Sequence, residues 1–371
     1  MARKLRFIPE GGALVEVTCR TIQGRFLLRP SSELNEIILG VLGKAQSLYP
    51  LEIVAYVWMS THFHLLLWVE DAQRLARFME YLNGNLAREV SRLTGWTDKI
   101  WSRRYQAIVI SEEEEAQIAR LKYILAHGAK EFLVAKAEKW PGVHCAIPLL
   151  TGATVEGTWF DRTGEYTARL RREEFDARQY ASVQEVILSQ LPCWRHLDPE
   201  VYRSRIAELL REINDTARQE RETKGIKPLG VKAILAQDPL DRPEAPKKSP
   251  APLFHAFRRE ARKALWEAYA WFLAAFREAA EKLRGGDLAA KFPIGSFPRQ
   301  ISCRQLSTSS PVRHRWFSLS DSRKRRPSQI SGATFPKEDS CSAGGSNLSD
   351  NHMACCSSDS AASGTSRSCK K

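Results

Sequence analysis

The residues His62 and His64 flank Phe63 in the run Thr61-His62-Phe63-His64-Leu65. Along a β-strand, residues two positions apart point to the same face of a sheet. The two imidazoles would therefore project from one open face, while Phe63 and Leu65 turn towards covering helices. Two imidazoles side by side can chelate one metal ion. The alternative is a pair of ordinary surface histidines on an edge strand, because this spacing also arises by chance.

A second group of reactive side chains falls on a helix expected from residue 113 to about residue 127. At about 100° per residue, three apolar side chains form its buried stripe: Ile118, Leu121 and Leu125. Tyr123, His127 and Arg120 share the roughly opposite sector, and Tyr123 and His127 are neighbours at i and i+4. This arrangement places a nucleophile, a third candidate metal ligand and a guanidinium on one face. The alternative is an exposed tyrosine beside unrelated polar residues.

These residue types together suit attack on a phosphodiester. That reaction needs a nucleophile and neutralisation of charge on the non-bridging oxygens, which a metal on His62, His64 and a third ligand would supply. Tyr123 has an ordinary pKa near 10, so its phenolate is a good leaving group when a 3′-hydroxyl attacks a phosphotyrosine. The bond energy is thereby kept for rejoining, which favours tyrosine over serine or water.

The elements that must position these residues follow from the hydrophobic pattern of the first 135 residues. Strands are expected at 13–19, 53–59, 63–70 and 106–111, with a turn at Ser60-Thr61. Helices are expected from Ser31 or Ser32 through Ala45, and from residue 75 to Gly95. The β-α-β-β-α-β order predicts an α+β, ferredoxin-like (split βαβ) domain, with two helices on one face and the other face free.

The rest of the chain divides by composition. We expect a catalytic domain at 1–148, a connecting region at 149–225 with an amphipathic helix at 199–223, and a helical C-terminal extension at 226–298. The extension should hold a short helical piece at 229–236 and a long helix at 254–283. Nineteen of the last 71 residues are serine, and hydrophobic periodicity is lost, so 299–371 is predicted to be a disordered tail.

Charge and cysteine usage narrow the class of protein. The net charge of +13 and a pI of about 9.4 indicate a polyanionic partner. The sequence contains no run of 18 apolar residues, which a membrane span would require. The N-terminus also lacks the apolar region of a secretion signal. Cys19, Cys145 and Cys193 are isolated, without zinc or disulfide spacing. We therefore expect a cytoplasmic protein without a membrane partner.

The same motifs carry a family resemblance. His62-Phe63-His64 resembles the His-hydrophobic-His motif of HUH nucleases, and the run from Tyr123 through His127 to Val134 is similar to the tyrosine helix of REP-associated tyrosine transposases. The resemblance covers about residues 10–145. It implies Mg²⁺ or Mn²⁺, single-stranded or hairpin DNA, and a 5′-phosphotyrosine intermediate on Tyr123.

The resemblance also implies that His62 and His64 are metal ligands. Relatives usually have Gln or Asn four positions after the tyrosine, where this chain has His127. Three nitrogen ligands would shift the preference from Mg²⁺ towards Mn²⁺ or a later transition metal.

Candidate DNA contacts lie just before the fourth strand and on the helix that carries Tyr123. Arg103 and Arg104 stand beside Trp101 and Tyr105, a mix of cations and rings that suits single strands, and Arg120 accompanies Tyr123. A solvated loop is the alternative for the first group. Basic residues ahead of the first strand could also hold phosphates: Arg3, Lys4 and Arg6.

The favoured function is a transposase-type, metal-dependent tyrosine endonuclease and strand-transferase. Two rivals remain: a nucleic-acid-binding protein that keeps the fold without activity, and a metal-dependent phosphodiesterase that uses water while Tyr123 is structural. A covalent DNA adduct separates the first function from both rivals. The sequence leaves open a monomer and a homodimer with shared active sites.

Truncation after Pro298 should leave folding and DNA cleavage intact, because the removed segment has no periodic apolar pattern to contribute to a core. Residues 301–371 carry 11 Lys and Arg against 5 Asp and Glu, so DNA affinity should weaken slightly, and less at high salt. Thermal melting and cleavage assays on the two forms check this. A clear drop in melting temperature or in cleavage would contradict it.

Overall fold

The computed structural model describes residues 5–171, 176–244 and 252–296, without the side chains of residues 177 and 178. Within them, a mixed five-stranded sheet has the order β2-β3-β1-β4-β7. Its strands are β1 (Ala13–Arg20), β2 (Glu52–Met59), β3 (His62–Val69), β4 (Gln106–Ile110) and β7 (Phe254–His255). β3 runs antiparallel to its neighbours β1 and β2, and β4 runs antiparallel to β1. The first four strands confirm the α+β split βαβ arrangement.

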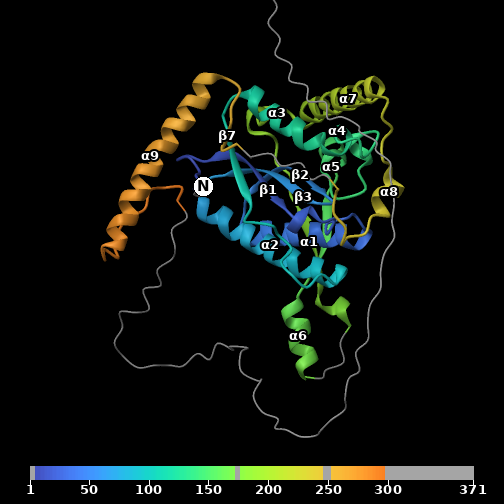
Figure 1. The fold of residues 1–371 in the computed structure, drawn as a ribbon, viewed down its shortest axis with the longest axis horizontal. Coiled ribbons are helices and arrows are strands. Elements are labelled where there is room, and N and C mark those ends of the chain that lie inside the picture. The colour runs from blue at the N-terminus through green and yellow to red at the C-terminus, as the bar shows by residue number, and fades with distance from the viewer. Residues whose placement is uncertain (1–4, 172–175, 245–251, 297–371) are drawn as a thin grey trace, which may run out of the picture. The chain divides into compact units, whose positions relative to one another are not determined.

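The two expected helices lie on one face of this sheet (Figure 1). They are α1 (Ser32–Leu48) and α2 (Ala72–Thr94). Ser31 caps α1 by accepting the Leu34 N–H, and Asp71 caps α2. α2 ends at Gly95, whose φ of 70° is the left-handed conformation that favours glycine. Local sequence signals thus define both ends of these helices.

The other face of the sheet is covered, which corrects the expectation of a free face. Helix α3 (Glu114–Leu125) packs on β2, β3 and β4, and Leu66, on the histidine side of β3, is fully buried. α4 (His127–Lys130), α5 (Ala146–Thr151) and α7 (Pro199–Lys224) add to this layer (Figure 1). Because the chain beyond β4 returns over the sheet, the histidines of β3 lie in an enclosed site.

A hairpin of β5 (Val155–Phe160) and β6 (Ala181–Val186) packs against α1, with α6 (Arg162–Arg171) between the two strands in sequence. The packing is backbone to backbone: a Cβ on Gly40 would lie 2.2 Å from the Thr158 carbonyl. Glycine in a helix interior costs about 1 kcal/mol relative to alanine. The close approach of the hairpin accounts for the glycine at position 40.

The C-terminal part contains α8 (Val231–Leu235), β7 and α9 (Arg259–Arg284). The expected long helix therefore begins at Arg259 and not at Phe254. Phe254 and His255 instead add a parallel strand to β4, where the Val109 and Ser111 N–H groups donate to the Leu253 and His255 carbonyls at 3.2 and 2.9 Å. An apolar residue such as Phe254 fits a helix or a strand equally well, so hydrophobic periodicity alone does not distinguish the start of α9 from the strand β7.

Short 3-10 turns complete the described structure at Ile22–Gly24, Ala137–Lys139, Ala177–Tyr180 and Pro192–Trp194. No helix among the described residues is long and apolar enough to span a membrane. The expected disordered tail at 299–371 lies outside the described residues, as do Arg3 and Lys4.

The end of α3 is tied to the sheet by His144. Its Nε2–H donates to the Leu125 carbonyl at 3.2 Å, and its Nδ1 accepts the Ala146 N–H at 3.0 Å. This neutral tautomer uses both ring nitrogens. Burial lowers the pKa of His144 from its ordinary 6.5 to about 4. Protonation would remove the Nδ1 lone pair that accepts the Ala146 N–H, while the Nε2–H bond to the Leu125 carbonyl would remain.

We expect this histidine to make stability acid-sensitive. Because its folded-state pKa is lowered, its contribution is complete above about pH 6.5 and is lost as pH falls towards 4, with a span of about 3 kcal/mol at most. Urea unfolding at pH 7 and 4.5 should show a smaller pH-dependent loss in His144→Gln than in the wild type. The exposed His196→Gln variant is the control and should keep the wild-type dependence. Equal losses in all three proteins would contradict the assignment.

Candidate metal centre and tyrosine site

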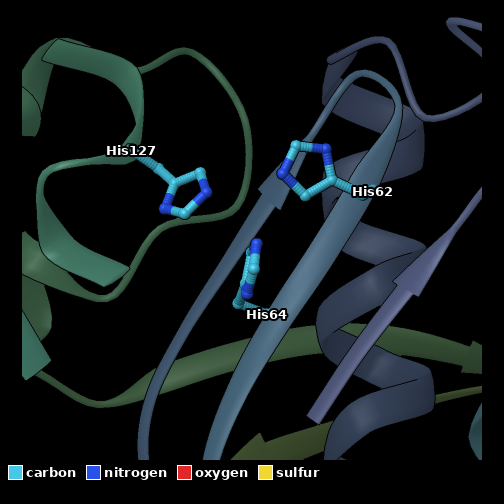
Figure 2. Close-up of side chains that lie close together, drawn as sticks. All are labelled: His62, His64 and His127. Carbon is cyan, nitrogen blue, oxygen red and sulfur yellow. The ribbon is translucent and has the colours of Figure 1, made fainter. Parts of the chain in front are cut away.

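Three histidines converge in the described structure: His62 and His64 from β3, and His127 from the start of α4 (Figure 2). One nitrogen from each lies within 4.8 Å of the others. The rings of His64 and His127 are closest, with centroids 4.3 Å apart. Two nitrogens on one tetrahedral ion lie about 3.4 Å apart when each bond is about 2.1 Å. The three rings are therefore close enough to share one cation once they turn towards one another.

The Nδ1 atom of each ring is already engaged. His64 Nδ1 contacts the Glu16 carboxylate at 2.6 Å, and His127 Nδ1 contacts the Tyr123 carbonyl at 3.0 Å. Because a carbonyl or an ionised carboxylate only accepts, both Nδ1 atoms carry the proton and leave Nε2 as the ligand atom. His62 Nδ1 lies 2.9 Å from the Thr61 hydroxyl, which can accept the same way. Metal-binding histidines usually have such outer partners.

The charge state of the rings also suits a cation. Burial is the main cause that lowers the pKa of His62 and of His127 well below the usual value, and the neighbouring histidines add to it. Both rings are therefore uncharged near neutral pH, as ligation requires. His127 is 3% exposed and His64 is 6% exposed. Three clustered imidazoles are a donor set that fits a divalent cation.

Tyr123 lies against this cluster. Its ring meets His127 edge-on at 4.8 Å and His64 at 5.7 Å between centroids. The Arg120 guanidinium and the Lys130 ammonium lie over the ring at 4.4 and 3.8 Å. Burial, followed by the charge of Glu16, raises the pKa of Tyr123, which Arg120 partly offsets. The hydroxyl is thus protonated at rest, with two cations placed to stabilise the phenolate.

The expected single helix is divided at this point: α3 ends at Leu125 and α4 starts at His127. The break does not separate Tyr123 from His127, since the Nδ1 contact to the Tyr123 carbonyl keeps the i and i+4 residues together. The spacing read from the sequence therefore gives the right pair of neighbours.

Glu16 is a site residue that sequence reasoning missed. It is 1% exposed, and its two oxygens accept from His64 and from Arg120 Nε. Burial alone would raise the pKa of Glu16, but the hydrogen bond from His64 and the charge of Arg120 lower it below its ordinary value. The available signal was a single acid in the apolar run Ala13–Cys19, which alternation places on the histidine side of the sheet.

The group opens into a cavity of about 1000 Å³. Arg103 and Arg104 are exposed and line this cavity. Arg120 lines it too, but its Nε is bound to Glu16. Trp101 does not line the cavity: its indole N–H donates to the Asn83 carbonyl at 2.9 Å, and its ring packs on Phe63.

Arg6, ahead of β1, makes a contact away from the histidine cluster. The guanidinium of Arg6 lies over the Tyr105 ring at 4.2 Å, and Tyr105 is buried. Tyr105 therefore packs inside the protein and does not offer a free ring to a base.

Residues 25–127 match the family described as IS200-like transposases. This segment is similar to an IS200-like transposase domain. It contains α1, β2, β3, α2, β4 and α3, and it ends at His127, so all three histidines and Tyr123 lie within it. β1 and Glu16 lie outside it. The match confirms the family resemblance expected for this part of the chain.

Two solved structures are similar to parts of the chain. One is a REP-associated tyrosine transposase bound to a REP hairpin, 18% identical, covering 38% of this chain and 81% of that chain, with a TM-score of 0.31. The other is a protein of Deinococcus radiodurans described as a transposase, 20% identical, covering 33% and 95% of the two chains, with a TM-score of 0.23. No curated protein matches the chain significantly.

Replacing His62 and His64 together with alanine should abolish stabilisation by Mn²⁺ in a thermal melt. At a hundredfold excess of Mn²⁺ over its dissociation constant, binding should stabilise the wild type by about 2.7 kcal/mol. The fold should survive, because Phe63, Leu65 and Leu67 supply the packing of β3 on the other face. His196→Ala, which removes an exposed histidine, is the control and should keep the full shift.

The third histidine is tested in the same melt. His127→Ala should weaken Mn²⁺ binding less than the double variant, and His127→Gln should recover much of the binding and of the DNA cleavage. A normal Mn²⁺ shift in the double variant would show that the pair is not the site. Equal inactivity of His127→Gln and His127→Ala would give this ring another role, such as proton transfer.

Proposed function

We propose that this protein cleaves and rejoins single-stranded or hairpin DNA through a covalent bond to Tyr123, beside a divalent cation held by His62, His64 and His127. The observation that carries the proposal is the edge-on packing of the Tyr123 ring against His127 and His64 in one cavity. A tyrosine that served packing alone would not need two buried imidazoles against its ring and two cations over it. The membership of the domain in a transposase family supports the same reaction class.

In the proposed cleavage step the Tyr123 oxygen attacks the scissile phosphorus. A phosphorus–phenolic oxygen bond forms, the bond from phosphorus to the 3′ oxygen breaks, and the DNA 5′ end remains on the tyrosine. The phenol loses its proton as the bond forms, and the departing 3′ oxygen gains one. Rejoining reverses this: a 3′-hydroxyl attacks the phosphotyrosine and releases the phenolate.

Arg120 and Lys130 would assist both directions. Each lies over the Tyr123 ring, at 4.4 and 3.8 Å, and a cation there stabilises negative charge on the phenolate more than it stabilises the neutral phenol. Because the pKa of Tyr123 is raised, the neutral phenol is the resting form. These cations therefore act mainly as charge develops during attack and departure.

The three histidines would hold the cation through Nε2, since their Nδ1 atoms are engaged elsewhere. The bound cation would neutralise the non-bridging oxygens of the scissile phosphate. Mg²⁺ and Mn²⁺ are the proposed ions, and three nitrogen ligands favour Mn²⁺.

Arg103 and Arg104 are proposed to guide the strand into the site. Both are exposed and line the cavity that holds Tyr123. Their charges would hold backbone phosphates without reading sequence.

Tyr123→Phe should abolish the covalent adduct and leave DNA binding nearly unchanged, because only the hydroxyl is removed. The assay uses a labelled DNA hairpin with single-stranded flanks and Mn²⁺, followed by a denaturing gel. Tyr166→Phe is the control, since Tyr166 is 63% exposed and lies on α6, and it should form adduct normally.

An adduct on Tyr123→Phe would place the nucleophile elsewhere, although Tyr105, the next tyrosine by position, is buried. Metal-dependent cleavage without any adduct in the wild type would favour a water-dependent phosphodiesterase. Binding without cleavage would favour a nucleic-acid-binding protein.

A further inference from the structure

Glu16 joins the two halves of the site. One half is on the sheet, where His64 belongs to β3, and the other half is on helix α3, which carries Arg120 and Tyr123. One Glu16 oxygen accepts a hydrogen bond from His64 Nδ1 at 2.6 Å, and the other accepts one from Arg120 Nε. One carboxylate thus contacts both partners.

On the sheet side, Glu16 determines which nitrogen of His64 is free. An ionised carboxylate has no proton to give, so His64 Nδ1 must donate and Nε2 must keep its lone pair. The antiparallel register sets the approach, because Thr18 lies opposite His64 and Glu16 lies one same-face position away on β1. The carboxylate therefore orients the ring and raises the basicity of its ligand nitrogen.

On the helix side, Glu16 determines where the Arg120 guanidinium lies. The ion pair holds Nε of Arg120, and the guanidinium plane then sits over the Tyr123 ring at 4.4 Å. An arginine without this partner would be free to turn towards solvent in the large cavity. The same carboxylate thus fixes a ligand on one side and a ring-stabilising cation on the other.

The neighbours of Glu16 show how unusual its position is. On the adjoining strands it is paired with Leu66 and Ile108, which are apolar and buried. Burying a carboxylate carries a desolvation cost that apolar residues of similar size avoid. Packing alone would therefore favour an apolar side chain at this point of the sheet.

We infer that Glu16 is a positioning residue that couples the metal ligand His64 to the nucleophile Tyr123 through Arg120. The inference rests on the proposed function and assigns this carboxylate a part in it. Occupation of the metal site and placement of the tyrosine then depend on one buried side chain.

The test is Glu16→Gln, which keeps the shape but offers one oxygen and one NH2 group. The amide can satisfy only one of the two N–H donors. We expect Mn²⁺ affinity, measured by thermal melts without DNA, to fall roughly 10- to 100-fold. The rate of adduct formation at saturating Mn²⁺ should also fall, about tenfold, because Arg120 is released from the tyrosine ring.

Glu89→Gln is the matched control. Glu89 is also buried and paired with arginines, but it belongs to α2 on the opposite face of the sheet (Figure 1). This variant should lower the melting temperature without changing Mn²⁺ affinity or the adduct rate. A loss of stability by itself is thereby separated from a positioning role.

Arg120→Met tests the helix side independently and does not require Glu16→Gln to fold. It should lower the adduct rate at saturating Mn²⁺ by about tenfold. In that background Glu16→Gln should weaken Mn²⁺ binding again but cost no further rate, a non-additive result that identifies coupling.

Unchanged Mn²⁺ affinity in folded Glu16→Gln would overturn the inference, and so would a normal adduct rate in Arg120→Met. If the wild type binds Mn²⁺ but forms no adduct, the proposed function fails, while the effect of Glu16→Gln on Mn²⁺ affinity still decides the role of Glu16 towards His64. Absence of Mn²⁺ binding by the wild type would overturn both.

Discussion

Three imidazole rings that share one small site repel one another once they are protonated, and this constraint governs the arrangement around them. Each added proton would place a cation beside two other basic rings, and Arg120 and Lys130 already stand next to Tyr123. The only acid hydrogen-bonded to the cluster in the described structure is Glu16, whose charge is shared with Arg120. Burial and the neighbouring rings lower the pKa of His62 and of His127, which favours their neutral form with a free lone pair. That is also the form in which an imidazole binds a divalent cation.

The site depends on two separately positioned elements. The strand register of β1 and β3 brings Glu16 and His64 to one face, while helix α3 brings Tyr123 across that face. His144 holds the end of α3 through the Leu125 carbonyl, so the turn from Leu125 to His127 is fixed relative to β2 and β3. Small shifts of this turn would alter both the distance from the β3 histidines to His127 and the orientation of the Tyr123 ring.

Local signals were enough to predict much of this. The alternation around His62 and His64, the cap at Ser31 and the stop at Gly95 act within a few residues, and each prediction of this kind is confirmed by the structure. Glu16, the β7 pairing and the covered second face could not be found this way, since each depends on residues far apart in sequence. The need for glycine at position 40 could not be found this way either, because it depends on the close approach of Thr158, more than a hundred positions later.

Both lateral edges of the sheet are occupied by later parts of the chain. On β2, the Val143 carbonyl accepts from the Trp58 N–H, and the Ser189 N–H donates to the Ile53 carbonyl. At the other end of the first four strands, β4 is covered by β7, where Leu253 and His255 accept from Val109 and Ser111. An open edge is a template for pairing with another chain and for aggregation. A shortened form ending before Leu253 would leave the β4 donors unpaired, so the C-terminal part also acts as the sheet's protection against self-association.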